Sequence, residues 1–178
     1  MSGPLSAFFI DDHRRLDGLL KKALAGGQVE ATAYGEFRAG ILRHIGMEER
    51  VLIPAATRAR GGTALPVARL LRLDHGAIAS LLVPPPSPRI IERIVAVLGP
   101  HNEAEERPGG LYAVCDELLV KEAETLLKAL RGFPEVPVAP HQDGRNVQRH
   151  IEETVRLARR GWADAAGAQP GPTVSHSG

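Results

Sequence analysis

The sequence contains an internal repeat that places histidine and glutamate at helical spacing twice. The first pair of similar segments is 12–20, which reads Asp-His-Arg-Arg-Leu-Asp-Gly-Leu-Leu, and 74–82, which reads Asp-His-Gly-Ala-Ile-Ala-Ser-Leu-Leu. The second pair is 44–50, His-Ile-Gly-Met-Glu-Glu-Arg, and 101–107, His-Asn-Glu-Ala-Glu-Glu-Arg. Each half of the chain therefore supplies one histidine and then a His-x-x-x-Glu motif, as a pair of helices.

Apolar residues recur at helical spacing almost throughout, and alternating β-branched runs are absent. Pro4 suits the first position of a helix, and Gly26-Gly27 suits the end of that helix. Pro54 lies inside the second predicted helix and should kink it one turn beyond Glu48. The predicted helices span about 4–25, 30–60, 66–82, 89–107, 111–131 and 143–162, and an extended link covers 133–140.

This pattern predicts an all-α protein. Four long helices with short connections are typical of an up-down four-helix bundle, here with an additional C-terminal helix. We expect residues 1–132 to form the bundle and residues 133–162 to form the linker and the C-terminal helix. Residues 163–178 are small, polar and rich in Pro and Gly, and we expect them to be a disordered tail.

Composition and charge exclude several classes of protein and of binding partner. The 178 residues are 43% hydrophobic and 24% charged, which is ordinary for one globular domain. Lys and Arg number 22 against 21 Asp and Glu, a net charge of +1, so no strong field favours nucleic acid or an anionic membrane. The single cysteine, Cys115, excludes an internal disulfide and a Cys-based zinc cluster.

Targeting signals are not recognisable in the sequence. The N-terminal segment lacks a basic region, and its apolar run is too short for a signal sequence. No stretch approaches the roughly 20 apolar residues that span a bilayer. We therefore expect a cytoplasmic protein.

The His-x-x-x-Glu motif has a direct structural meaning. Residues four apart lie one above the other on a helix face, so His44 and Glu48 point to the same place. His101 and Glu105 do the same in the second half of the chain. With one further histidine from each half, His13 and His75, four imidazoles and two carboxylates converge in the bundle. This donor set suits two transition-metal ions.

The alternative interpretation is a set of ordinary core residues. A single histidine on an apolar face is more often a hydrogen-bonded core residue than a metal ligand. A buried glutamate is different, because burying an unpaired carboxylate costs on the order of several kcal/mol unless a positive charge neutralises it. The repeated motif therefore favours metal binding. Ferritin-type sites need Glu-x-x-His and zincin proteases need His-Glu-x-x-His, and the sequence contains neither arrangement.

The motifs resemble those of the hemerythrin-like (HHE cation-binding) family over roughly residues 5–112. The resemblance rests on Asp12-His13, on His44-x-x-x-Glu48-Glu49 followed by Leu52-Ile53-Pro54, on Asp74-His75, and on His101-x-x-x-Glu105-Glu106. It implies two Fe ions with an oxo or hydroxo bridge. It also implies that His13 and His44 serve one iron, that His75 and His101 serve the other, and that Glu48 and Glu105 bridge them.

One departure from the oxygen-carrying hemerythrins bears on function. Those proteins carry two histidines four apart on the third helix, whereas the positions four residues from His75 are Leu71 and Ala79. Four histidines and two glutamates would leave an open position on each iron. This set is similar to the di-iron domain of repair-of-iron-centres proteins, which act under nitrosative and oxidative stress.

Two functions remain open at this stage. The resemblance implies a di-iron protein that reacts with O₂, NO or peroxide, as an enzyme supplied by an unidentified electron donor. The alternative is a non-catalytic module that binds or senses O₂, NO or iron.

The sequence also suggests roles for several residues outside the six predicted ligands. We expect Glu49 and Glu106 to face solvent or to pair with arginine, and Asp12 and Asp74 to act in capping or salt bridges. Tyr112 follows the Pro108 break by one turn and is placed to reach the metal pocket as a hydrogen-bond donor. The remaining expectations are a buried Cys115, a core position for Tyr34, and solvent exposure for His141, His150 and His176.

Overall fold

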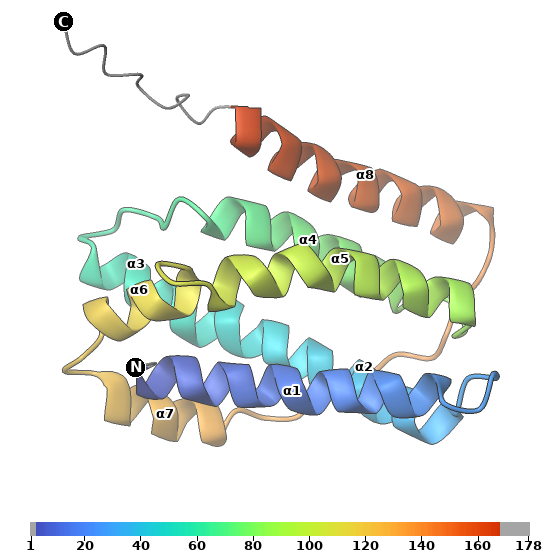
Figure 1. Ribbon diagram of the computed structural model, residues 1–178, viewed down its shortest axis with the longest axis horizontal. Coiled ribbons are helices and arrows are strands. Elements are labelled where there is room, and N and C mark those ends of the chain that lie inside the picture. Colours follow the sequence, from blue (N-terminus) through green and yellow to red (C-terminus); the bar gives the residue numbers. More distant parts are fainter. Residues whose placement is uncertain (1–2, 168–178) are drawn as a thin grey trace, which may run out of the picture.

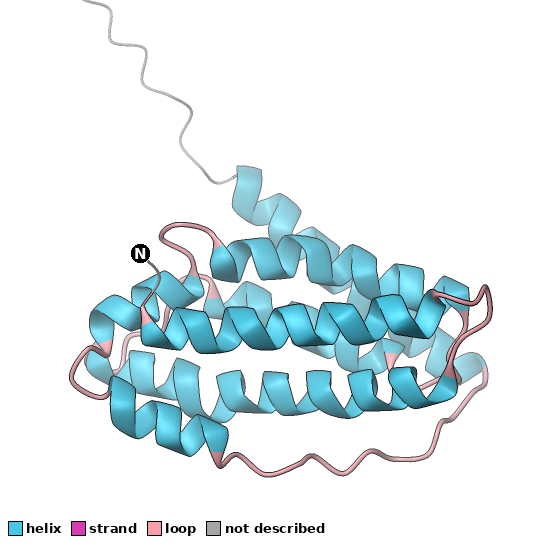
Figure 2. Cartoon of the chain, turned by 60° about the horizontal axis from the view of Figure 1, so that its bottom comes forward, coloured by secondary structure: helices cyan, strands magenta, loops and turns pink. Residues whose placement is uncertain are grey.

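A computed structural model of the chain describes residues 3–167, and every regular element in that range is a helix (Figures 1 and 2). The all-α prediction is confirmed for these residues. In chain order the elements are α1 (Pro4–Leu24), α2 (Ala31–Met47), the π-helical segment η1 (Glu48–Leu52), α3 (Ile53–Ala59), α4 (Ala68–Leu81), α5 (Pro88–Glu106), α6 (Leu111–Leu118), α7 (Ala123–Arg131) and α8 (Arg145–Gly167).

Local chemistry sets the ends of the long helices. Pro4 occupies the first turn of α1, and Gly27, with a φ of 75°, follows its end. The Glu30 carboxylate accepts hydrogen bonds from the backbone N–H groups of Thr32 and Ala33, which caps α2. Ser87 caps α5 in the same way through the N–H of Ile90.

The core consists of two hydrophobic clusters, one at each end of the long helices. Along α1, Phe9 belongs to one cluster and Leu16 to the other. The same division separates Leu71 from Ile78 on α4. The residues that lie between these pairs include His13 and His75, so the predicted site residues lie between the two clusters.

Pro54 is accompanied by a change of helix type. The helix that begins at Ala31 changes to π geometry at Glu48, where the N–H of Ile53 bonds to the carbonyl of Glu48 five residues earlier. Pro54 has no N–H, so it cannot bond to the carbonyl of Arg50 as an α-helix requires. The irregularity therefore begins at Glu48 itself, earlier than the kink expected one turn beyond it.

The predicted helix 111–131 is wrong as a single element. The structure divides it into α6 and α7, with a turn in which Leu119 is buried and Val120 is exposed. The turn lets Leu126 and Leu130 of α7 join the core cluster that contains Phe9 and Leu52. Tertiary burial therefore overrides the local helical pattern here.

The C-terminal helix is longer than predicted. Residues 163–167, assigned above to a disordered tail, form the last turns of α8, because Ala163, Ala165 and Ala166 are good helix formers. The rest of the predicted tail, 168–178, lies outside the described residues. Helix α8 packs along α4 (Figure 1), and Ile151, Val155 and Ala158 join the core there.

The link between α7 and α8 is extended, as predicted, and runs past α2. The guanidinium of Arg43 donates to the carbonyl of Phe133, and that of Arg38 donates to the carbonyl of Ala139. Among residues 3–167, no helix has the length and apolarity needed to cross a membrane.

Candidate metal centre

The six predicted ligand residues meet between the two core clusters. All six are buried, and Glu48 and Glu105 have 0% exposed surface. They come from five helical elements: His13 from α1, His44 from α2, Glu48 from η1, His75 from α4, and His101 and Glu105 from α5.

The four imidazoles present their Nε2 atoms to the two carboxylates. For Glu48, Oε1 is 3.5 Å from Nε2 of His44 and Oε2 is 3.1 Å from Nε2 of His75. For Glu105, Oε2 is 3.5 Å from Nε2 of His13 and 3.3 Å from Nε2 of His101. Each carboxylate therefore contacts one histidine of the pair His13 and His44 and one of the pair His75 and His101.

Two groups of donor atoms have the spacing of a metal site. One contains Glu48, His75, His101 and Glu105, and the other contains His13, His44 and Glu105. Within each group the donor atoms lie within 4.8 Å of one another. The histidines divide into the same two pairs that the family resemblance implies. These buried groups can hold metal ions, and the identity of the metal stays a prediction.

Each of the four histidines also contacts a carboxylate through its other ring nitrogen. Nδ1 of His13 is 2.5 Å from Glu106, and Nδ1 of His75 is 2.8 Å from Glu49. The remaining two contacts are Nδ1 of His44 with Asp12 at 2.9 Å and Nδ1 of His101 with Asp74 at 3.3 Å.

These contacts add a role to those expected for the four acidic neighbours, among which Glu106 is exposed as predicted. Glu49 does pair with an arginine, Arg72, and Asp12 with Arg15, but each also orients a histidine. When a carboxylate accepts the Nδ1 proton, the Nε2 lone pair is directed to the metal position and the imidazole becomes more basic. The available signal was the repeat itself, in which these acidic residues adjoin four of the six predicted ligands, namely His13, Glu48, His75 and Glu105.

The metal-free site balances its buried charges with protons. Burial alone would lower the pKa of His44 and His75, but Glu48 and the neighbouring carboxylates raise both to about 9. Burial, with the nearby His44, lowers the pKa of His13 to about 3. Burial and the charge of Glu48 raise the pKa of Glu105 well above its usual value. Metal ions at this place would supply the positive charge that protons provide here.

Three ligand atoms lack a hydrogen-bond partner within residues 3–167: Glu48 Oε2, His75 Nε2 and Glu105 Oε1. The first two lie 3.1 Å apart without the alignment of a hydrogen bond. A buried polar atom without a partner is costly, and a carboxylate oxygen especially so. Metal coordination would satisfy all three atoms, so the residues present fit a metal group.

Tyr112 reaches the centre from α6, as expected. Its hydroxyl donates to Oε1 of Glu48 at 2.6 Å and lies 3.1 Å from Oε2 of Glu105. It is also 3.2 Å from Nε2 of His13, so the hydroxyl lies on the side of the site that holds His13 and His44.

The packing of its ring and of the backbone before it positions Tyr112. The ring stacks on Phe9 with centroids 4.9 Å apart. Gly110 permits this approach, because a Cβ there would lie 2.6 Å from the carbonyl oxygen of Ala104.

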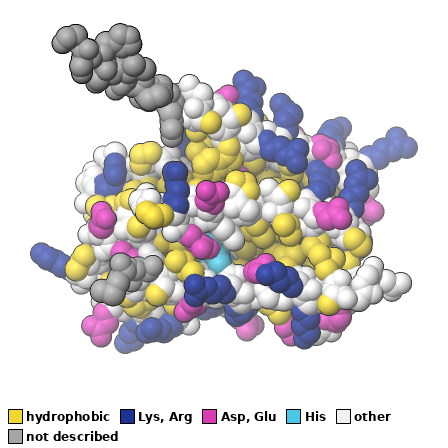
Figure 3. Space-filling model, in the orientation of Figure 1, with side chains coloured by type: hydrophobic (Ala, Val, Ile, Leu, Met, Phe, Trp, Pro, Cys, Tyr) yellow, Lys and Arg dark blue, Asp and Glu magenta, His cyan; other side chains and the backbone are white. Residues whose placement is uncertain are grey.

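An apolar cavity of about 170 Å³ lies beside His13, between α1, α2 and α5. Its lining is mostly hydrophobic and includes Leu16, Phe37, Ile41 and Leu98. In the space-filling view a histidine side chain shows through at the middle of the face, next to a band of hydrophobic side chains (Figure 3). The cavity therefore places open space directly beside a predicted ligand.

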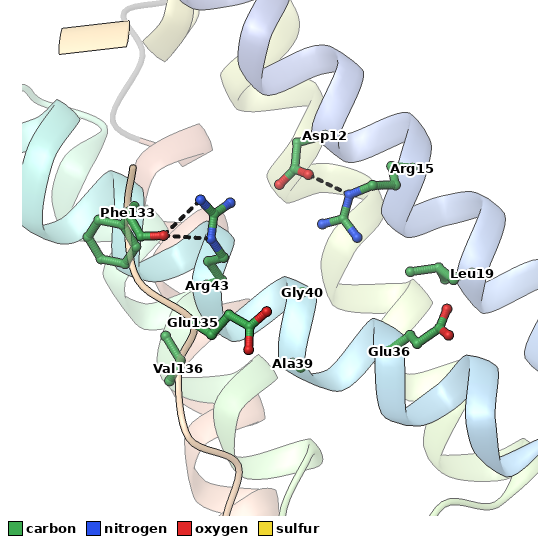
Figure 4. A pocket seen from close by; sticks show the side chains of 10 residues that line it. All are labelled: Asp12, Arg15, Leu19, Glu36, Ala39, Gly40, Arg43, Phe133, Glu135 and Val136. Carbon is green, nitrogen blue, oxygen red and sulfur yellow. Dashed lines mark hydrogen bonds and ion pairs between the residues drawn. The ribbon is translucent and has the colours of Figure 1, made fainter. Parts of the chain in front are cut away.

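A second, larger opening of about 770 Å³ lies between α1, α2 and the extended link (Figure 4). Half of its lining residues are charged, among them Arg15, Glu36 and Glu135. Asp12 lines this opening, hydrogen-bonded to Arg15. The opening therefore reaches Asp12, the carboxylate that contacts Nδ1 of His44. None of the six predicted ligands lines it.

The other residues singled out in the sequence differ in their burial. Leu71 is fully buried, whereas Ala79 is exposed and lies off the buried face of α4. Cys115 is buried, and burial raises its pKa to about 12. Tyr34 is buried in the core, His141 and His150 are exposed, and His176 lies outside the described residues.

Comparisons with protein-family models, with curated proteins and with solved structures found no match to this chain.

Proposed function

We propose that this chain is a hemerythrin-like protein that holds two iron ions and reacts with O₂, NO or peroxide. In this proposal α1, α2 with η1, α4 and α5 form an up-down four-helix bundle around the metal centre. One observation carries the proposal: each of the two fully buried carboxylates contacts one histidine from each pair, as bridging ligands between two metal ions would.

The donor set favours transition metals. Four imidazole nitrogens with two shared carboxylates suit Fe, whereas Mg²⁺ and Ca²⁺ take mostly oxygen ligands. Zn²⁺ in a structural site takes a closed tetrahedral set from one group of residues. Here Glu105 belongs to both groups of donor atoms, which supports two ions that share ligands.

Ferrous iron at these positions would supply electrons to O₂, NO or peroxide. The residues of the chain would control access and orientation. The apolar cavity beside His13 favours small, neutral molecules over ions, because desolvating an ion in an apolar passage is costly. Tyr112 keeps a proton on its hydroxyl, because burial and the two glutamates raise its pKa well above the usual value. That hydroxyl therefore donates a hydrogen bond within the His13 side of the site.

Repeated turnover would require an electron donor, and we propose a cytoplasmic location for the protein, where such donors are present. A non-catalytic module that binds or senses O₂, NO or iron is the alternative. A catalyst consumes many equivalents of NO or peroxide per chain when reductant is supplied, whereas a sensor or carrier consumes no more than its bound metal can reduce.

The decisive experiment is metal analysis of protein purified with and without oxygen, followed by absorption spectra before and after O₂, NO and peroxide. We expect about two iron atoms per chain and spectral changes with each reagent. One stoichiometric zinc ion, or no metal after expression with abundant iron, would overturn the proposal.

A further inference from the structure

Helix α8 contributes one side chain to the hydrogen bonds around the candidate metal centre. The indole N–H of Trp162 donates to Oδ2 of Asp74 at 2.9 Å. The same oxygen is 3.3 Å from Nδ1 of His101. A continuous path therefore runs from α8 through Asp74 to a predicted metal ligand.

The two halves of the repeat differ at this point. Asp12, the counterpart of Asp74, binds His44 with one oxygen and Arg15 of its own helix with the other. Asp12 is 13% exposed, whereas Asp74 is 2% exposed and receives its second donor from α8. The carboxylate that supports His44 is thus held by a residue of its own helix α1, whereas the carboxylate that supports His101 receives a donor from α8, a helix that lies outside the repeat.

Close packing holds Trp162 in place. Gly161 lies against Leu73 and Leu70 of α4, and a Cβ on Gly161 would be 2.8 Å from Cδ1 of Leu73. Two turns earlier along α8, the hydroxyl of Thr154 is 2.7 Å from that of Ser80 of α4. The missing side chain at Gly161 lets α8 approach closely enough for the neighbouring indole to reach Asp74.

We propose that Trp162 is a positioning residue for the metal centre, and that docking of α8 on α4 is thermodynamically coupled to metal binding through Asp74 and His101. This inference rests on the proposed function only in requiring that a metal binds at this site. With two donors on one oxygen, Asp74 is held in the orientation that directs Nε2 of His101 to the centre. Coupling is reciprocal, so metal binding also strengthens the docking of α8.

The test compares two variants that each remove one hydrogen bond between α8 and α4. Trp162→Phe keeps an aromatic ring but removes the donor to Asp74, and Thr154→Val removes the contact with Ser80 far from the site. We expect Trp162→Phe to weaken Co²⁺ binding about 10-fold or more, the range found when such supporting contacts to metal ligands are lost. Thr154→Val should bind Co²⁺ like the unmodified protein.

The double variant separates positioning from general packing. In an Asp74→Asn background, Trp162→Phe should add little to the loss of Co²⁺ affinity, because the two residues act as one unit. Additive losses, equal affinities in Trp162→Phe and the unmodified chain, or an equal loss in Thr154→Val would each overturn the inference. Failure of the unmodified protein to bind any metal would instead refute the proposed function, and the inference with it.

A measurement on the unmodified protein removes any dependence on how well the variants fold. Trp162 is the single tryptophan of the chain, so its indole N–H gives one resolved nuclear magnetic resonance signal. We expect addition of a diamagnetic ion, Zn²⁺, to slow the exchange of this signal with solvent. An indole signal whose exchange rate is the same with and without metal would contradict the coupling.

Discussion

Nδ1 of His13 lies 2.5 Å from a carboxylate oxygen of Glu106, although the two residues are 93 positions apart in the sequence. The repeat-related contact joins His75 to Glu49, so each half of the chain supports a histidine that belongs to the other half. Neither half contains a complete site by itself. The centre forms only when both helix pairs are packed together.

Replacing Glu106 by Gln should weaken metal binding about 10- to 100-fold, because His13 then loses the carboxylate that orients it and raises its basicity. Isothermal titration with Fe²⁺ under anaerobic conditions measures this change. The matched control is Glu103→Gln, an exposed position on the same helix, which should bind iron normally. Equal weakening in both variants would show that Glu106 acts only through surface charge.

Stability of the metal-free protein should fall as the pH rises from 6.5 to 9. The pKa values of His44 and His75 rise from 6.5 in the unfolded chain to about 9 in the folded protein. Their stabilisation is therefore fully present below pH 6.5 and is lost as the pH passes through 9. The raised pKa of Glu105 acts in the same direction. Urea unfolding across this pH range tests the prediction.

Metal should change that pH dependence. Bound ions displace the protons of His44 and His75, so metal binding strengthens as the pH rises toward 9. The free energy of unfolding of the loaded protein should therefore decline less over the same range. A metal-free protein that becomes more stable from pH 6.5 to 9 would contradict the charge balance described for the site.

Replacing Tyr112 by Phe should destabilise the metal-free protein by about 1–3 kcal/mol, because Oε1 of Glu48 loses its 2.6 Å hydrogen bond in a buried place. The loss should be smaller in the loaded protein, where metal neutralises the carboxylate. The control is Tyr34→Phe, since the hydroxyl of Tyr34 is buried without a hydrogen-bond partner among residues 3–167. Thermal unfolding of both variants, with and without metal, measures these losses of stability. Equal losses in Tyr112→Phe and Tyr34→Phe would refute the role of Tyr112.

Filling the cavity beside His13 should slow the reaction with small molecules. Leu98→Trp places a larger side chain in a space of about 170 Å³. We expect a several-fold lower rate of oxidation of the ferrous protein by O₂ or NO, with unchanged iron content. Leu157→Trp, on the exposed side of α8, should leave the rate unchanged. Stopped-flow absorption gives both rates, and an unchanged rate in Leu98→Trp would mean that access follows another route.

A fifth histidine on α4 should move the protein toward reversible oxygen binding. In the proposed di-iron centre, the ferrous protein should be oxidised by O₂ without a long-lived oxygenated form, since four histidines would leave open positions at both metals. Leu71→His adds a ligand on the buried face of α4 and should lengthen the life of any oxygenated form. Ala79→His is the matched control, because Ala79 is exposed. Reversible oxygen binding by the unmodified protein would show that the ligand count does not decide this behaviour.

The sequence by itself determined the helical class, the six residues that converge and the helix faces that carry them. Spacing of four within a helix is a local property, so His44 with Glu48 and His101 with Glu105 share a face in any structure in which those helices form. The repeat then indicated that the two halves act together. The sequence could not define where α6 ends, because burial of Leu119 and Leu126 is a property of the packed core.

Only the tertiary structure decided which groups support the ligands. Whether Glu106 also reaches His13 depends on how α5 lies against α1, and no spacing along one helix carries that information. The same holds for Trp162, which reaches Asp74 because Gly161 allows α8 to pack closely on α4. Periodicity describes contacts within an element, whereas hydrogen bonds between residues about ninety positions apart exist only once several elements have packed together.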